Sequence, residues 1–161
     1  MGEQIGRGTT QGLWDYACEL YRREGSEQLL LGLQDDQGAD VLLLIAACWV
    51  GLRGIDLDVG EWRDVVVWHT PWREQVIEPL RRVRRHLLGH TGRSSLYEQV
   101  KAAELAAEKE QLVRLESYLG QRGQVSTGQG VLQALRACCA GQGIDAGKGM
   151  ERRLDSLAQL A

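Results

Sequence analysis

The amino-acid sequence predicts an all-α protein, a compact bundle of about five to six helices around one apolar central helix. Three observations support this prediction. Apolar residues recur at the three- and four-residue spacing of helices through most of the chain, and no run of any length alternates as a strand does. Residues 41–52 are apolar on every side, so a helix there must be surrounded by others. Helix start and stop signals divide the rest into segments of helical length.

The first three helices follow from their apolar stripes and their ends. Residues 13–21 place apolar side chains on one face, and a second helix over 26–37 ends where Gly38 supplies a left-handed stop. Asp40 is the expected cap of the central helix, 41–52, because a carboxylate there accepts from free backbone N–H groups.

Two further helices are expected before residue 92. Asp58 caps a fourth helix, and Thr70-Pro71 predicts a restart, with a cap residue followed by proline at the first helical position. The fifth helix places Val83 on its inner face. Pro79 lies inside this helix, lacks an N–H donor and is expected to kink it.

The longest helix is expected over 95–119. Ser95 and Glu98 have the spacing of a capping box, in which each side chain bonds the other residue's backbone. Leu105 and Leu112 belong to the apolar stripe that should face the core.

The chain changes character after this helix. Residues 120–149 contain eight of the twenty glycines, which predicts little packed core. Short helices over 131–139 and 150–160 interrupt the glycines. The predicted organisation is a flexible N-terminus, a helical domain and a glycine-rich C-terminal segment, over 1–10, 11–119 and 120–161.

Composition excludes several classes of protein. With 161 residues, 43% hydrophobic and a formal net charge of −3, the chain fits one soluble domain. Its first residues lack a secretory signal, and a membrane-spanning helix needs about 20 apolar residues, more than 41–52 supplies. We therefore expect a cytoplasmic protein with no membrane partner. Four cysteines without a paired spacing, including the adjacent Cys138 and Cys139, are expected to be buried or idle thiols.

A basic cluster, defined as Arg81, Arg82, Arg84 and Arg85, follows an acidic first half. Residues 1–80 carry fourteen acidic and six basic side chains, whereas 81–93 carry five arginines and no acid. The cluster is either a phosphate-binding surface or one side of an internal charge balance. No aromatic residue interleaves with it, which lowers the case for binding single-stranded nucleic acid.

Three carboxylates, those of Asp35, Asp36 and Asp40, meet at a predicted helix junction. They could hold Mg²⁺ against a phosphate group, but the sequence has no second aspartate-rich helix to complete such a site. We therefore favour a role in helix capping for Asp40 and solvent exposure or pairing with arginine for Asp35 and Asp36. A helix-turn-helix at this junction is excluded, because its second helix would be the apolar 41–52, and no sequence-specific DNA binding is expected. His86 and His90 are four residues apart, which is thin support for a metal site. No cofactor is expected.

Several short words of the sequence, taken in order, resemble a proteobacterial family of small proteins catalogued as a domain of unknown function. The resemblance spans 11–119 and rests on Leu13-Trp14-Asp15-Tyr16-Ala17, Leu33-Gln34-Asp35, Gly38-Ala39-Asp40-Val41 followed by three leucines, Trp49, Trp72, Pro79-Leu80-Arg81 and Ala103-Glu104-Leu105. Leu42 stands where the family often has Asn, and Asp36 lies outside the pattern. The resemblance implies a bacterial cytosolic protein and brings no activity with it.

The sequence thus contains no catalytic motif, and we expect a non-enzymatic module that binds another protein. At least one of its five tryptophans should lie at a surface groove. Two alternatives remain open: an anion-binding or catalytic protein with Asp35 and Asp40 opposite Arg81 and Arg84, or an RNA- or ribosome-associated protein using residues 81–85. The candidate surface comprises Gln34, Asp35, Asp40, Trp72, Arg81, Arg82, Arg84 and Arg85.

Overall fold

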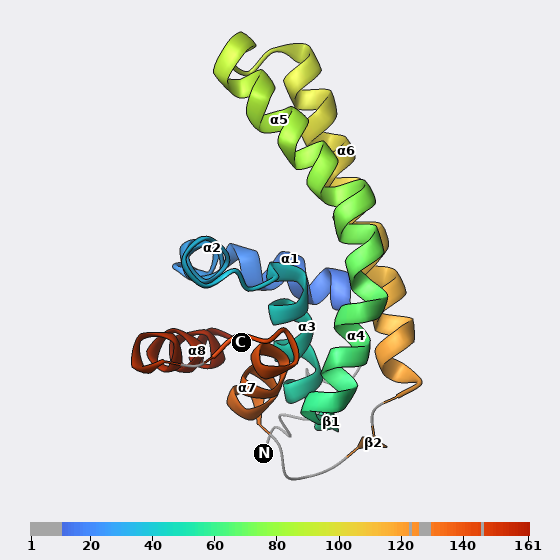
Figure 1. Cartoon of the computed structure of the whole chain (residues 1–161), viewed down its shortest axis with the longest axis vertical. Coiled ribbons are helices and arrows are strands. Elements are labelled where there is room, and N and C mark those ends of the chain that lie inside the picture. The colour runs from blue at the N-terminus through green and yellow to red at the C-terminus, as the bar shows by residue number, and fades with distance from the viewer. Residues whose placement is uncertain (1–10, 123, 126–129, 146) are drawn as a thin grey trace, which may run out of the picture.

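The computed structural model describes residues 11–122, 124–125, 130–145 and 147–161, so the expected flexible segment 1–10 lies outside the described residues. The architecture is all-α, as predicted (Figure 1). The helices are α1 (Leu13–Arg22), α2 (Ser26–Gln37), α3 (Val41–Leu52), α4 (Val59–Trp72), the π-helical segment η1 (Arg73–Ile77), α5 (Glu78–Thr91), α6 (Ser95–Gly120), α7 (Val131–Gly141) and α8 (Lys148–Leu160). Two short strands, β1 (Ile55–Asp56) and β2 (Gln124–Val125), pair antiparallel.

Helix α3 is the centre of the molecule, which confirms the predicted central helix. Every residue from Val41 to Gly51 is buried. Asp40 caps the helix, and its carboxylate accepts the backbone N–H of Leu43 at 3.1 Å. Helices α1, α2, α6 and α7 and strand β1 all contact α3. An apolar helix without a polar face is therefore surrounded, as its composition requires.

The C-terminal helices belong to the same core, so the expectation that residues 120–149 hold little packed core is wrong. Helix α7 packs against both α3 and α4. Two glycines permit the close approach: a Cβ at Gly51 would lie 2.6 Å from the Cα of Val131, and a Cβ at Gly141 would lie 2.5 Å from the Cβ of Trp62. These glycines serve tight helix packing, and a count of glycines cannot distinguish that role from flexibility.

Helices α4, η1 and α5 form one continuous helical segment, so the expected restart at Thr70-Pro71 is wrong. Pro71 deprives the carbonyl of Val67 of its donor, but Val67 lies on the exposed side, where water can replace that donor. Pro79 cannot donate four residues back either. The chain absorbs this loss as the wider turn η1, in which the N–H of Glu78 donates to the carbonyl of Arg73.

Helix α5 and the first half of α6 pair antiparallel and project from the rest of the molecule (Figure 1). We call this hairpin, residues 78–108, the arm, and the other helices the body. The expectation that Val83 and Leu105 face inward is wrong, because they are 48% and 54% exposed. A two-helix hairpin has no third layer to cover its sides, so helical spacing alone does not ensure burial.

The start of α6 also differs from the prediction. Ser94, one residue earlier than expected, is the cap, and its hydroxyl accepts the N–H of Tyr97 at 3.2 Å. The capping box expected at Ser95 therefore does not form. The cap predicted at Asp58 is confirmed, and Asp58 and Glu61 form a complete capping box with both bonds at 2.8 Å.

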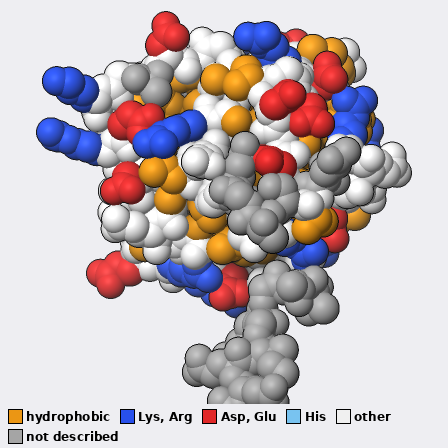
Figure 2. Space-filling model, turned by 90° about the horizontal axis from the view of Figure 1, so that it is seen from below, with side chains coloured by type: hydrophobic (Ala, Val, Ile, Leu, Met, Phe, Trp, Pro, Cys, Tyr) orange, Lys and Arg blue, Asp and Glu red, His pale blue; other side chains and the backbone are white. Residues whose placement is uncertain are grey.

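At the end of the body opposite the arm, the described side chains that are visible carry charges of both signs (Figure 2). Figure 2 shows this face, where Lys and Arg side chains are interspersed with Asp and Glu and hydrophobic side chains lie between them. Among the described residues, no helix is both long enough and apolar enough to cross a membrane.

Candidate functional site

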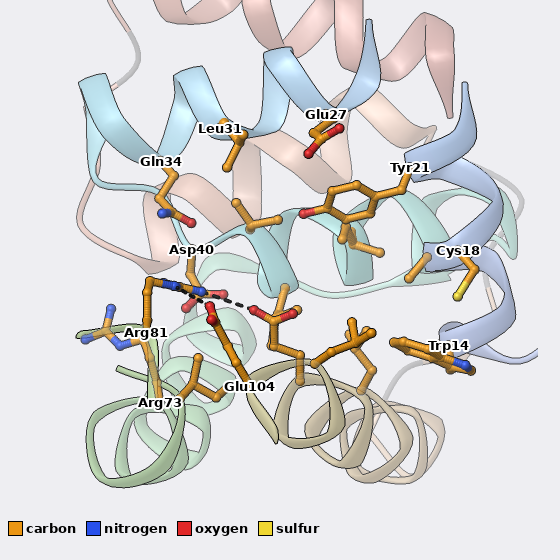
Figure 3. Close-up of a pocket in the computed structure, with 18 of the residues that line it drawn as sticks. Trp14, Cys18, Tyr21, Glu27, Leu31, Gln34, Asp40, Arg73, Arg81 and Glu104 are labelled. Atoms are coloured by element: carbon orange, nitrogen blue, oxygen red, sulfur yellow. Dashed lines mark hydrogen bonds and ion pairs between the residues drawn. The ribbon is translucent and has the colours of Figure 1, made fainter. Parts of the chain in front are cut away.

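A groove lies between the arm and helices α1 and α2, with the start of α3 as its floor (Figure 3). Its volume is about 530 Å³. Ligand sites in proteins commonly enclose roughly 300–1,000 Å³. Side chains of the two walls point toward one another across the groove, so its surface combines residues far apart in the sequence.

The first wall is one face of α1 and one face of α2. Trp14, Cys18 and Tyr21 follow helical spacing on α1, and Leu31 and Gln34 do so on α2. Tyr21 is 38% exposed and Leu31 is 42% exposed, so this wall presents large apolar surface to solvent. Burial, together with neighbouring carboxylates, raises the pKa of Tyr21 to about 12, and its phenol remains a hydrogen-bond donor.

The second wall contains an ion-pair network inside the arm. Glu104 is buried and accepts from Arg81 Nε at 3.1 Å and from Arg84. The other guanidinium nitrogens of Arg81 donate to Glu78 at 2.8 Å and Glu108 at 3.2 Å. Burial alone would raise the pKa of Glu104, but the hydrogen bonds from Arg84 and Arg81 hold it below its usual value. An ionised, buried carboxylate therefore joins α6 to α5.

The floor carries an ionised aspartate held by a directed chain of hydrogen bonds. Arg114 donates to Gln111 Oε1 at 3.3 Å, so the amide nitrogen of Gln111 faces His69 Nδ1, 2.9 Å away. His69 Nδ1 is then the acceptor, and Nε2–H donates to Asp40 Oδ2 at 2.9 Å. Burial raises the pKa of Asp40, but the bonds from His69 and Leu43 outweigh it and the pKa is lowered. Asp40 thus presents a fixed negative charge to the groove.

A second carboxyl in the groove has the opposite tendency. Burial raises the pKa of Glu108, and the nearby charge of Glu104 adds to the effect. Glu108 can therefore take up a proton more readily than Asp40, and the groove offers both a hydrogen-bond acceptor and a protonatable group. In the part of the chain that the structure describes, no three His, Cys, Asp or Glu side chains gather so as to hold a metal ion.

The structure brings together most of the candidate residues chosen from sequence. Those that line the groove are Gln34, Asp40, Arg81, Arg84 and Arg85. Asp35 and Arg82 are exposed outside it. Trp72 also lies outside the groove lining, and its indole N–H donates to the carbonyl of Ala107 at 3.0 Å, which ties α4 to α6. Trp14 lines this groove, which agrees with the expectation that at least one tryptophan lies at a surface groove.

The members of the basic cluster and the three aspartates of the helix junction have different surroundings in the fold. Arg81 and Arg84 pair within the arm, whereas Arg82 and Arg85 are exposed and form no ion pair with any described residue. The three aspartates of the helix junction also separate: Asp36 pairs with Arg153 of α8 at 2.7 Å, while Asp40 faces the groove. The dispersal removes the basis for a magnesium site there.

Sequence reasoning missed Glu104, Tyr21 and Leu31 as residues of this site. Glu104 lies seven residues from both Tyr97 and Gln111, and all three are buried on one face of α6. That repeat is one available signal, and the family resemblance, which includes Ala103-Glu104-Leu105, is another; a glutamate on a long helix is nevertheless ordinarily solvated. Tyr21 belongs to the predicted apolar stripe of the first helix, and nothing in the sequence shows that its side of the helix is left partly open. Leu31 belongs to no predicted stripe.

Fold and groove together define a class: an all-α protein with a ligand-sized groove between a projecting helical arm and a helical body. The chain belongs to the family described as Protein of unknown function (DUF2390), whose model matches residues 12–115. This confirms the resemblance seen in the sequence. The matched range includes every groove-lining residue, whereas α7 and α8 lie beyond it. No curated protein and no solved structure matches the chain.

Proposed function

We propose that the protein is a non-enzymatic interaction module that holds a helical segment of another protein in the groove. One observation carries this proposal: three large apolar side chains around a single groove, those of Tyr21, Leu31 and Leu105, are 38%, 42% and 54% exposed. Apolar surface gathered around a hollow is typical of a binding site, because its burial against a partner is favourable.

The dimensions of the groove suit a helix. The groove-lining residues on the continuous helical segment of η1 and α5 extend from Arg73 to Arg85. At 1.5 Å per residue this is roughly 18 Å, or about three helical turns. Faces of α1 and α2 form the opposite wall, so a helix lying between them would be contacted on two sides. Partner helices bound in this way contribute apolar anchors three, four and seven residues apart.

Polar groups at the groove would orient the segment. The carboxylate of Asp40 at the floor and the amide of Gln34 beside it offer acceptors to a bound segment, and an unmet hydrogen bond there becomes costly once the segment excludes water. The alternative of a small anion between Asp40 and the arm is less well supported. Glu104 already occupies donors of Arg81 and Arg84, so an anion would compete with a carboxylate of the chain itself.

Site-specific photo-crosslinking in cells of the native host tests this proposal. A photoreactive amino acid replaces Leu31 or Leu105 in the groove, and the matched control replaces Val113, which is also on α6 and is 50% exposed but lies outside the groove. We expect one discrete protein adduct shared by the two groove positions and absent from the control position. Mass spectrometry of the adduct identifies the crosslinked segment of the partner.

The same experiment can refute the proposal. Adducts of equal yield at Val113 and Leu105 would show nonspecific contact. Absence of any protein adduct at both groove positions, with the variant produced at wild-type level, would exclude a partner segment in the groove.

A further inference from the structure

The end of the arm is positively charged and the rest of the chain is negatively charged. Residues 81–101 carry six basic side chains and one acidic side chain, whereas the rest of the chain carries thirteen basic and twenty-one acidic ones. The turn between α5 and α6, in the middle of this segment, lies at the end that projects farthest from the body (Figure 1), whereas Arg81 and Arg84 line the groove and are paired with glutamates of the arm. A molecule polarised in this way orients with its arm toward an anionic surface and its body away from it.

The charge at this end is available to a partner. Arg82 and Arg93 are exposed and form no ion pair with any described residue, in contrast to Arg81 and Arg84 on the inner side. Arg85 is exposed as well but also borders the groove. Free guanidinium groups on one end of a helical hairpin are suited to phosphate oxygens.

Aliphatic side chains lie exposed among these arginines. Val83, Leu88 and Leu96 are 48%, 45% and 55% exposed, and α5 has no fully buried residue. No described element of the body packs over this end of the arm. The exposed end thus combines cationic groups with aliphatic groups, as in segments that bind at the interface of a bilayer.

We propose that the end of the arm docks on an anionic lipid surface. Arg82 and Arg93 would contact lipid phosphates while Leu88 and Leu96 enter the interfacial region. A nucleic acid would satisfy the arginines but give the leucines no apolar partner, and binding of single strands relies on exposed aromatic side chains, whereas Tyr97 at this end is buried. The lack of a spanning helix among the described residues does not bear on a peripheral contact of this kind.

Vesicle sedimentation of the full chain tests the inference. We expect binding to vesicles of phosphatidylcholine containing phosphatidylglycerol, increasing with the anionic fraction and weakening as salt is raised, and no binding to phosphatidylcholine alone. The double variant Arg82→Glu/Arg93→Glu should reduce the partition coefficient by about tenfold or more. Leu88→Ser/Leu96→Ser should also weaken binding and leave its salt dependence in place.

Matched controls and opposite outcomes complete the test. Arg63→Glu on α4 and Val113→Ser on α6 change exposed residues of the same types away from the arm end, and should bind as the wild type does. No binding to anionic vesicles overturns the inference. Retention of full binding by the leucine double variant overturns the apolar contact, and binding of mixed-sequence RNA but not of vesicles would identify a nucleic-acid surface instead. The groove proposal stands or fails separately, because Leu31 and Leu105 are unchanged here.

Discussion

The substitution Glu104→Gln tests the ion-pair network that holds the arm together. Glutamine keeps the volume of the side chain and removes its charge. Arg81 would retain Glu78 and Glu108 as partners, whereas Arg84 would retain no ion pair among the described residues. The arm has no fully buried residue in α5 to compensate for the loss.

The expected magnitude follows from the burial of the partners. Loss of one partner of a buried ion pair costs about 3–5 kcal/mol, and a hydrogen bond to a charged group contributes about 1.5–3 kcal/mol. Because the side chains of Arg81 and Arg84 are 16% and 22% exposed, water can solvate them in part. We therefore expect the free energy of unfolding to fall by about 2–3 kcal/mol at pH 7.

Acid should remove this difference. The pKa of Glu104 in the folded chain lies below its ordinary value of 4.5, so its contribution is present above pH 4.5 and is lost as the pH falls through the lower, folded value. Urea denaturation followed by circular dichroism measures the free energy at each pH, and amide hydrogen exchange in α5 reports opening of the arm. Wild type and variant should converge in acid.

The control is Glu110→Gln, an exposed glutamate on the same helix for which a change within about 0.5 kcal/mol is expected. Equal losses for the two variants, or a loss from Glu104→Gln that stays constant down to acid pH, would refute the role assigned to the network.

Three further tests address other parts of the molecule. Gly51→Ala places a Cβ 2.6 Å from a backbone atom of α7 and should lower the free energy of unfolding by about 1–3 kcal/mol. The control Gly89→Ala, at an open helical position, should raise the free energy of unfolding by about 0.5–1 kcal/mol. Equal effects of the two substitutions in urea titrations would contradict the close approach of α3 and α7. Asp40→Asn keeps a capping side chain but removes the negative charge that accepts the hydrogen bond from His69. We expect the free energy of unfolding to fall by about 1.5–3 kcal/mol at pH 7, and this difference from the wild type should shrink as the pH falls below 3.8. A difference independent of pH would contradict an ionised cap. A maleimide should label Cys18 in the groove wall and spare Cys138, because Cys138 is buried and its burial raises the pKa of its thiol well above 9.0. Peptide mass spectrometry measures the extent of labelling at each cysteine, and equal labelling of the two would contradict the burial of Cys138.

Local signals in the sequence were sufficient for much of the fold. Asp40 and Asp58 cap their helices as predicted, and Gly38 takes a left-handed conformation at φ 69° to end α2. These outcomes depend on a few neighbouring residues, and an entirely apolar helix such as 41–52 can only be central.

The parts that could not be predicted depend on residues distant in sequence. Gly51 and Gly141 are packing residues because other helices cross there, and their neighbours in the sequence do not show this. Pro71 does not interrupt the helix because the carbonyl that loses its hydrogen-bond donor, that of Val67, lies on the solvent-exposed side. The groove could not be predicted because its wall depends on Arg81 and Arg84 turning inward to Glu104, which lies twenty or more residues away in the sequence. The sequence analysis placed Asp40, Gln34 and the four arginines of the basic cluster in one candidate surface. Only the fold distinguishes the arginines that form ion pairs from those that form none with any described residue.

The central claim is that the groove binds a helical segment of another protein. The segment identified by crosslinking at Leu31 and Leu105 can be made as a synthetic peptide and titrated against the wild-type chain, Leu105→Glu and the matched Val113→Glu by fluorescence anisotropy. A charge placed in the groove should raise Kd by about tenfold or more, a change of about 1.4 kcal/mol, whereas the control should leave Kd unchanged. Equal affinities for all three proteins, or equal weakening by Leu105→Glu and Val113→Glu, would contradict the assignment of the groove as the binding site.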